Sequence, residues 1–349
     1  MIGKLNKIML NTNYKLLLII ILFLGCNTTA EKKDTLKFKS SKKNTTIDDR
    51  DHVSHRKVLI PKFNADSAYY FIEKQVSFGP RFISSKGWEK CAVWLEKKMQ
   101  EYTPHVIIQK APIKTYDKKN HILKNIIASF SPEENHRIAL FAHWDTRHIA
   151  DHDVENQESP ILGANDGGSG VAVLLEIARQ FHILKPKIGV DIILFDAEDY
   201  GQPENSNYPI MKDSWWLGSQ YWSKKPHKEG YFAYYGILLD MVGAKNATFR
   251  HEYISSYYAS HILEKVWKKA HQLGFGKHFI FENAPQIMDD HYYVNLFSGI
   301  PTIDIIEHDP TTKTNFNKHW HTHKDDMNNI DKNTLTAVGQ TLIEIIYTE

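Results

Sequence analysis

The feature that most constrains the fold is the alternation, from Ile60 onward, of short apolar runs with longer stretches of helical period. The apolar runs predict buried strands, and the intervening stretches predict helices that carry the chain from one strand to the next. Such crossovers indicate a largely parallel sheet covered on both faces, in one α/β domain over residues 58–349. The predicted strands span 137–145, 190–196, 234–242 and 300–306, and the predicted helices span 167–184, 255–273 and 332–347.

The N-terminal segment differs in composition from this domain. Lys4, Lys7 and Lys15 precede an apolar run, Leu16–Leu24, which is followed by Gly25 and Cys26. A bilayer requires about 20 apolar residues, so this shorter run predicts a signal peptide over residues 1–25 rather than a membrane-spanning helix.

Gly25 before Cys26 is similar to the lipobox of bacterial lipoproteins, in which the cysteine is acylated and becomes the new N-terminus. Ordinary cleavage without lipidation is the alternative. Residues 26–57 are rich in Lys, Ser, Thr and Asp and have few large apolar side chains, which predicts a flexible tether. We therefore expect a protein exported to the bacterial cell envelope and lipid-anchored on its periplasmic side or at the cell surface.

The charge distribution argues against a nucleic-acid partner. Residues 1–60 hold 12 Lys and Arg against 5 Asp and Glu, whereas the whole chain has a net charge of only +2. The predicted domain is therefore mildly acidic and lacks a basic footprint. Cys91 is the one cysteine after Cys26, and it lies in an amphipathic helical pattern, so we predict a buried apolar residue rather than a nucleophile.

Polar side chains cluster where the predicted strands end. They are His143 and Asp145 after the first strand, Glu198 and Asp199 after the second, Asp240 after the third, Asp289 and Asp290 before the fourth, and Asp166 in a glycine-rich loop. The carboxyl ends of parallel strands meet at one edge of a sheet, where ligands bind. A single acid there is most often a helix cap or a turn residue, and Asp166 alone fits that role.

So many acids at one edge repel one another unless a cation or shared protons compensate them. Carboxylate and imidazole donors together suit zinc, whereas calcium and magnesium sites are built from oxygen donors. The glycine-rich loop Gly163–Gly170 lacks the Lys-Ser/Thr ending of a phosphate-binding loop. The pattern therefore favours a zinc site over a phosphate site.

Three histidines at alternate positions, His319, His321 and His323, offer further metal ligands. In an extended segment their side chains would point to the same side of the chain. Spacing alone leaves all three as candidates.

Several motifs together resemble the zinc-dependent aminopeptidase superfamily, whose fold has a central mixed sheet. They are His143-Trp-Asp145, the loop Gly163–Gly170, Phe195-Asp-Ala-Glu-Asp199 and His321. Within it, the segment Leu238–Phe249, Met288-Asp-Asp-His291 and Trp320-His321 resemble glutaminyl-peptide cyclotransferases, or glutaminyl cyclases. The resemblance spans roughly residues 66–345, and Phe78-Gly-Pro-Arg81 is shared by both groups. It implies a single domain with a central mixed, mostly parallel sheet flanked by helices on both faces.

The resemblance also implies roles for individual residues. Asp166, Asp199 and His321 would bind one zinc ion per chain, which leaves His319 and His323 as rim or surface residues. Glu198 would be the general base and acid, and Asp240 and Asp289 would form the carboxylate network that holds the substrate amine. Trp320 and Asp304 would contribute to substrate binding. Animal cyclases have glutamate at the position of Asp199 and histidine at that of Asp304.

The resulting functional prediction is an enzyme that converts the N-terminal glutamine of peptides or proteins to pyroglutamate and releases ammonia. The first alternative is a zinc aminopeptidase with two ions, in which His143 and Asp240 complete the second site. A non-catalytic binding module on the same fold is the second alternative. The sequence gives no prediction of oligomeric state.

Overall fold

The computed structural model describes residues 59–349, which lie within one compact unit, Arg56–Glu349. The predicted signal peptide, the tether and the lipidation residue Cys26 lie outside the described residues. Within the described part, no helix combines the length and apolar character needed to cross a bilayer.

A six-stranded mixed sheet forms the centre of the domain, with strand order β1-β2-β4-β3-β5-β8. The first two neighbouring pairs, β1 with β2 and β2 with β4, are antiparallel, and the other three pairs are parallel. The strands are β1 (Val106–Lys114), β2 (Asn120–Phe130), β3 (Arg137–His143), β4 (Gly189–Phe195), β5 (Gly236–Asp240) and β8 (Thr302–Ile306). A separate parallel pair consists of β6 (Phe249–His251) and β7 (Phe279–Asn283).

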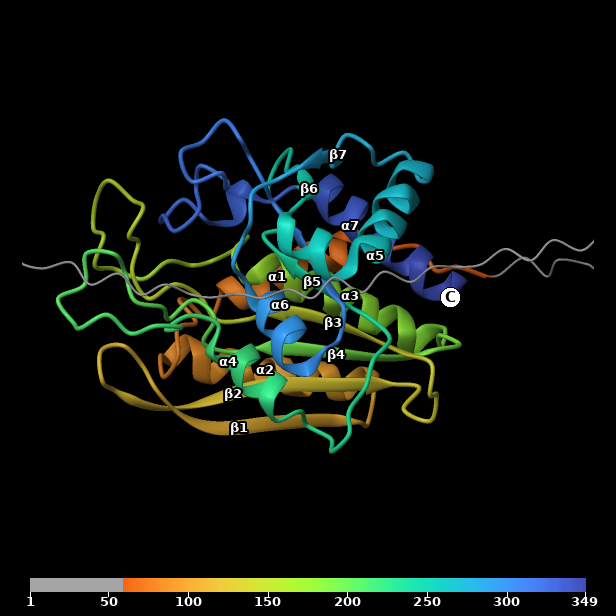
Figure 1. Ribbon diagram of the computed structural model, residues 1–349, viewed down its shortest axis with the longest axis horizontal. Coiled ribbons are helices and arrows are strands. Elements are labelled where there is room, and N and C mark those ends of the chain that lie inside the picture. Colours follow the sequence, from red (N-terminus) through yellow and green to blue (C-terminus); the bar gives the residue numbers. More distant parts are fainter. Residues whose placement is uncertain (1–58) are drawn as a thin grey trace, which may run out of the picture. The chain divides into compact units, whose positions relative to one another are not determined.

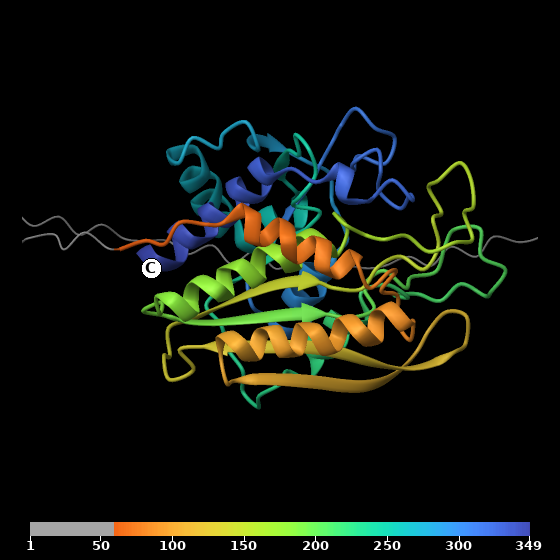
Figure 2. The same ribbon diagram turned by 180° about the vertical axis from the view of Figure 1, so that it is seen from behind.

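Helices cover both faces of the sheet, as Figures 1 and 2 show from opposite sides. One face carries α1 (Ala65–Val76), α2 (Lys86–Tyr102), α3 (Gly168–Ile183), α5 (Tyr253–Gln272) and α7 (Lys332–Thr348). The other carries α4 (Leu217–Lys224), α6 (Asp290–Tyr293) and the π-helical turn η1 (Val294–Ser298). A 3₁₀ turn, η2 (Met327–Asn329), precedes α7.

The two cores follow from the alternation of side chains along each strand. Leu140 of β3 and Leu194 of β4 point into the larger core, where they join Leu174 of α3. Phe141 of β3 and Phe195 of β4 point to the opposite face and pack against Trp222 of α4. Strands buried on both sides therefore appear in the sequence as unbroken apolar runs.

The predicted fold class is confirmed, and the differences concern the ends of elements and the antiparallel edge of the sheet. β3 ends at His143, two residues before the predicted end, and β5 spans only 236–240 because Met241 adopts a positive φ of 48°. The hairpin of β1 and β2 was not predicted, and it supplies the antiparallel part of the sheet. Cys91 is fully buried, as predicted.

Candidate active site

The polar residues predicted to gather at the carboxyl edge of the sheet do so. The loops after β3 and β4 extend beyond the strand ends on the same side of the molecule (Figure 2). A cavity of about 370 Å³ opens there, a volume typical of small-molecule sites. The predicted site residues that line it are Asp166, Glu198, Asp199, Asp240, Asp289, Trp320 and His321.

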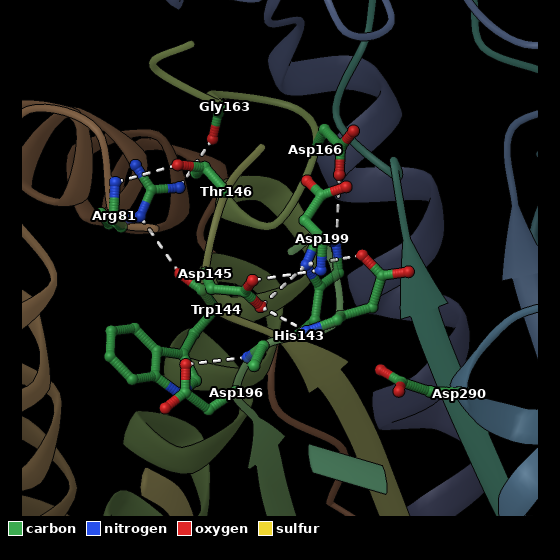
Figure 3. Close-up of polar contacts among 12 residues, drawn as sticks. Arg81, His143, Trp144, Asp145, Thr146, Gly163, Asp166, Asp196, Asp199 and Asp290 are labelled. Atoms are coloured by element: carbon green, nitrogen blue, oxygen red, sulfur yellow. Dashed lines mark hydrogen bonds and ion pairs between the residues drawn. The ribbon is translucent and has the colours of Figure 1, made fainter. Parts of the chain in front are cut away.

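The glycine-rich loop is held by Arg81, the last residue of the Phe-Gly-Pro-Arg motif (Figure 3). The guanidinium is fully buried and donates hydrogen bonds to the backbone oxygens of Trp144, Leu162 and Gly163 at 3.2, 2.7 and 2.8 Å. Gly163 has a φ of +59°, a conformation that side chains disfavour. Arg81 therefore fixes the loop that delivers Asp166 to the site.

Asp325 holds the same loop from a distant part of the chain. Its two carboxylate oxygens accept hydrogen bonds from the backbone amides of Asn165 and Asp166, at 2.8 and 3.0 Å. The carboxylate thus fixes the backbone of Asp166 and leaves the Asp166 side chain free to face the cavity.

Asp145 orients the turn after β4 in a similar way. Its carboxylate accepts the backbone amides of Glu198 and Asp199, at 3.0 and 3.1 Å. Ala197, just before them, has a positive φ of 55°, so the chain turns sharply there, and both acids that follow line the cavity. The strand-end aspartate therefore acts as a scaffold and does not line the cavity.

Asp166, Asp199 and His321 form a set suited to a metal ion. Their donor atoms lie within 4.8 Å of one another, and all three residues are buried. His321 Nε2 lies 3.2 Å from Asp199 Oδ1, while one carboxylate oxygen each of Asp166 and Asp199 has no hydrogen-bond partner among the described residues. Two unpartnered buried carboxylate oxygens beside an imidazole are donors of the kind that zinc takes.

The pKa values of this set reflect burial and the close approach of the two carboxylates to the imidazole. Burial, followed by the charge of Asp199, raises the pKa of Asp166 to about 7. Burial opposes the protonation of His321, but Asp199 and Asp151 outweigh it and raise the pKa of His321 to about 9. A bound cation would compensate the two carboxylates and favour neutral His321.

The orientation of His321 comes from a neighbour that the sequence did not reveal. Asp151 Oδ1 lies 3.0 Å from His321 Nδ1, which turns Nε2 toward the two aspartates. Asp151 is itself bound by Arg147, whose other nitrogen donates to the backbone oxygens of Asp199 and Gly201. A carboxylate behind a ligand histidine is the usual way in which a metal site fixes its imidazole.

The three alternate histidines do not form a cluster. Residues 318–324 lie in turns rather than in an extended segment, and His321 has a positive φ of 55°, so the alternation argument does not apply. Of the three, only His321 lines the cavity. His323 lies 2.9 Å from Asp153, and His319 lines a separate surface hollow.

A second group of possible ligands adjoins the first. His143 Nε2 lies 3.0 Å from Asp240 Oδ1 and 3.1 Å from Asp166 Oδ1, and all three residues are buried. Burial opposes protonation of His143, but the charges of Glu198 and Asp240 outweigh it and raise its pKa. This group has the residues that a second metal ion or a protonated imidazole would need.

Glu198 lines the cavity together with the ligand set and with a pair of acids, Asp240 and Asp289. Burial and then the charge of Asp199 raise its pKa well above the usual value, and Asp289 adds to the effect. For Asp289, burial and the charge of Asp240 raise the pKa to about 6. A carboxyl group with a raised pKa exchanges protons near neutral pH, as a general base and acid must.

The expectation that Asp304 contacts the substrate does not fit its position. Asp304 is fully buried, does not line the cavity and has a carboxyl oxygen within 4.8 Å of one of Asp289. Burial and the charge of Asp289 raise the pKa of Asp304 well above its usual value. His291 lies behind it, 3.7 Å from Asp304 and 3.1 Å from Glu252. Asp304 therefore supports Asp289 from behind.

The aromatic walls of the cavity include two tryptophans whose role the sequence did not indicate. Trp215 and Trp216 line the cavity with Trp320. The Trp215 ring stacks on His321 at 6.0 Å and lies under the Arg147 guanidinium. It also packs so closely on Gly201 that a Cβ there would lie 1.8 Å from the ring. A glycine two residues after Asp199 was the sequence signal for this close approach.

The fold and the site together define a metal-dependent enzyme of the zinc exopeptidase type. Residues 125–346 match Peptidase family M28, and the chain belongs to that family.

Solved structures of bacterial proteins are similar over their whole length. A Zn-dependent exopeptidase from Parabacteroides distasonis is 49% identical, with a TM-score of 0.82, and the alignment covers 83% of this chain and 100% of that one. A glutaminyl cyclase from Bacteroides thetaiotaomicron, bound to N-acetylhistamine, is also 49% identical, with a TM-score of 0.81 and the same coverage.

A more distant relative is the glutaminyl-peptide cyclotransferase of Bos taurus, which is 26% identical over 250 residues. That alignment covers 62% of this chain and 64% of the relative, so the chain spans just under two thirds of its length. The family and its zinc-dependent neighbours point to zinc as the metal.

Proposed function

We propose that the enzyme converts the N-terminal glutamine of peptides and proteins to pyroglutamate and releases ammonia. The observation that carries this function is a single cavity that Glu198 lines together with the metal-ligand set and with Asp240 and Asp289. The full-length similarity to bacterial glutaminyl cyclases supports the same reaction.

In this proposal Asp166, Asp199 and His321 hold one zinc ion per chain. When bound, zinc supplies a Lewis acid that polarises the γ-carbonyl group of the glutamine side chain. The two unpartnered carboxylate oxygens and the Asp151-oriented imidazole support this assignment.

The other residues bind the substrate and carry its protons. Asp240 and Asp289 face the cavity and accept hydrogen bonds from the α-amino group. Glu198 takes a proton from this amine as its nitrogen forms a bond to the carbonyl carbon of the side-chain amide (Cδ), and returns the proton to the amide nitrogen as the old C–N bond breaks. Ammonia leaves, and no water is consumed. Because the nucleophile belongs to the substrate, the site needs mainly to orient it.

The aromatic walls suit a short side chain inserted from the end of a peptide. Trp215, Trp216 and Trp320 are half-buried around the cavity and provide apolar surface beside its polar base. Exclusion of water by these rings would favour attack by the tethered amine over hydrolysis.

Hydrolysis by a two-zinc aminopeptidase is the second candidate, and a specific observation supports it. His143, Asp166 and Asp240 place three donor atoms within 4.8 Å of one another, next to the first set. A bridging water between two ions would be the nucleophile of that reaction.

Incubation of the enzyme with a glutamine-initiated peptide separates the two reactions. The proposal predicts one ammonia per peptide and a product lighter by the mass of ammonia, with the number of residues unchanged. Free glutamine and a shortened peptide would establish the aminopeptidase. An otherwise identical peptide that begins with alanine is the control, because a cyclase cannot process it.

The cellular location is a separate proposal that rests on the sequence pattern alone. Lipidation at Cys26 would anchor the domain in the bacterial cell envelope through residues 26–57. Cys26→Ala should then move the protein from the membrane fraction to the soluble fraction of cells, and an unchanged distribution would refute the anchor.

A further inference from the structure

A second cavity, of about 430 Å³, lies beside the active-site cavity. The two have three residues in common, Trp215, Trp216 and Met288. The remaining walls of the second cavity come mainly from the loop 202–214 and from Tyr293 of α6. A ligand that fills the first cavity and continues outward past the two tryptophans therefore reaches the second.

The loop 202–214 has a defined shape because it closes around one side chain. The Gln202 amide donates to the backbone oxygens of Tyr208 and Pro209, at 3.0 and 3.2 Å, and accepts from Met211 N at 2.7 Å. Its backbone amide also donates to Ser214 Oγ at 3.0 Å. The loop thus forms a preorganised wall rather than an open connection.

The charge of the second cavity is of one sign. Glu204 and Asp213 line it, and its lining includes no lysine or arginine. Asp213 is fixed by Tyr293, whose hydroxyl donates to Asp213 Oδ1 at 2.8 Å, and by Gln220, which binds its backbone oxygen at 2.9 Å. Lys212 belongs to the same loop but is exposed and does not line the cavity.

Neither acid forms an ion pair within residues 59–349. The side chain of Asp213 accepts the Tyr293 hydroxyl at one oxygen, and its other oxygen has no hydrogen-bond partner in that range. Trp216 and Tyr293 provide aromatic surface in the same space, whereas the Trp215 ring is already in contact with Arg147 and His321. Carboxylates beside aromatic faces attract an ammonium or guanidinium group and repel an acid.

We propose that this second cavity binds a lysine or arginine side chain of the substrate, at the second or third residue of the peptide. The inference rests on the proposed function, which places the N-terminal glutamine in the first cavity and directs the rest of the chain outward. The enzyme then prefers basic peptides and proteins over acidic ones, and the loop 202–214 determines that preference.

The test compares matched peptides that differ at one position, with Lys, Ala or Glu at residue two and, in a second series, at residue three. Ammonia release gives kcat/KM for each peptide. In at least one series the wild-type enzyme should favour Lys over Glu by roughly fivefold to twentyfold, as expected for two exposed carboxylates and an aromatic surface. The ratio of kcat/KM for the Lys and Glu peptides should fall as salt rises from about 0.01 to 0.15 M, because the shorter Debye length screens the charges of the cavity from those of the peptide.

Two variants assign the preference to this cavity. Glu204→Gln and Asp213→Asn should each reduce the Lys-to-Glu ratio, and the double variant should bring it close to one. Asparagine suits Asp213 because it tolerates the positive φ of 54° and keeps an oxygen for Tyr293. Glu229→Gln removes an equal charge from an exposed residue that does not line the second cavity, and it should leave the ratio as in the wild type.

The outcomes are distinct. Turnover of the alanine peptides with equal rates for Lys and Glu in both series would overturn this inference and leave the proposed function intact. A Lys preference that survives in the double variant would also overturn it. Absence of ammonia from every glutamine peptide would overturn the proposed function and this inference with it.

Discussion

The two sides of the active site carry similar buried acids but differ in how their charge is compensated. On one side, Asp166 and Asp199 face His321, and each of these residues is positioned by hydrogen bonds to its backbone or ring. On the other side, Asp289 lies beside the buried Asp304, and an oxygen of Asp289 and both oxygens of Asp304 have no hydrogen-bond partner within residues 59–349. The first side, with Asp166, Asp199 and His321, suits a cation and is called the cation side. The second, with Asp289 and Asp304, suits shared protons and is called the proton side.

This difference explains how one cavity can both polarise a carbonyl group and handle an amine. Asp166, Asp199 and His321 on the first side would hold a cation, which would supply stabilisation of negative charge on the substrate oxygen. Protonatable acids on the second side accept hydrogen bonds from nitrogen without a fixed excess of negative charge. Glu198 lies between the two sides and can exchange a proton with the substrate.

Removal of a ligand on the cation side should have the largest effect. His321→Ala should lose the metal and reduce kcat/KM by at least about 10⁴-fold, because the Lewis acid is lost with the ion. Metal content and ammonia release measure both effects. His319→Ala and His323→Ala are matched controls that should keep the metal, since neither residue lines the cavity. Loss of metal in either control would reassign the ligand.

Glu198→Gln should have the next largest effect, and only on chemistry. The amide cannot accept the substrate proton, so kcat should fall by about 10³-fold while the metal content stays unchanged. The pair of measurements separates a base from a ligand. If the variant loses its metal, Glu198 is a metal ligand, and the roles of Glu198 and Asp199 must be exchanged.

The proton side should reveal itself in the dependence of stability on pH. The pKa of Asp289 is raised to about 6 by burial and by Asp240, so the folded state binds the proton more tightly than the unfolded chain. The stabilising contribution of the protonated form is therefore present at low pH and is lost as pH rises from about 4 to 6.

Asp289→Asn removes this contribution. Relative to the wild type, the variant should gain on the order of 2 kcal/mol in unfolding free energy between pH 4 and pH 7. Urea denaturation of the metal-free proteins at both pH values measures the change. A difference between variant and wild type that does not vary with pH would contradict proton compensation at Asp289.

The smallest effect is expected behind the proton side. Burial and the charge of Asp289 raise the pKa of Asp304, which favours its neutral form, and asparagine is neutral, has the same shape and can donate a hydrogen bond toward Asp289. Asp304→Asn should therefore change kcat/KM by at most about threefold, whereas Asp304→Leu, which has no polar group at this buried position, should cost at least about tenfold. Equal losses in the two variants would show that Asp304 acts as a charged carboxylate.

The sequence predicted the residues whose positions depend on the sheet. His143, Glu198, Asp199 and Asp240 follow strands, so parallel pairing brings them to one edge. It did not predict contacts between loops distant in sequence, such as the bonds from Asp325 to an amide 160 residues away. Hydrophobic periodicity and short motifs do not predict such contacts, because the position of a loop depends on hydrogen bonds to residues that are distant in sequence.

Of the three alternate histidines, only His321, which the resemblance assigned to the metal, lines the cavity. The alternation itself did not identify it, because alternation orders side chains only in extended backbone, and this segment turns. Asp304 was expected at the substrate from the family resemblance. Its register on β8 beside Leu238 buries it behind Asp289 instead.

The amount of zinc bound per chain most directly tests the difference between the two sides of the active site. Elemental analysis of the active wild-type enzyme, of Asp289→Asn and of His321→Ala should give one zinc, one zinc and none. Two ions per chain in the wild type, or loss of zinc in Asp289→Asn, would contradict the separation of the site into a cation side and a proton side.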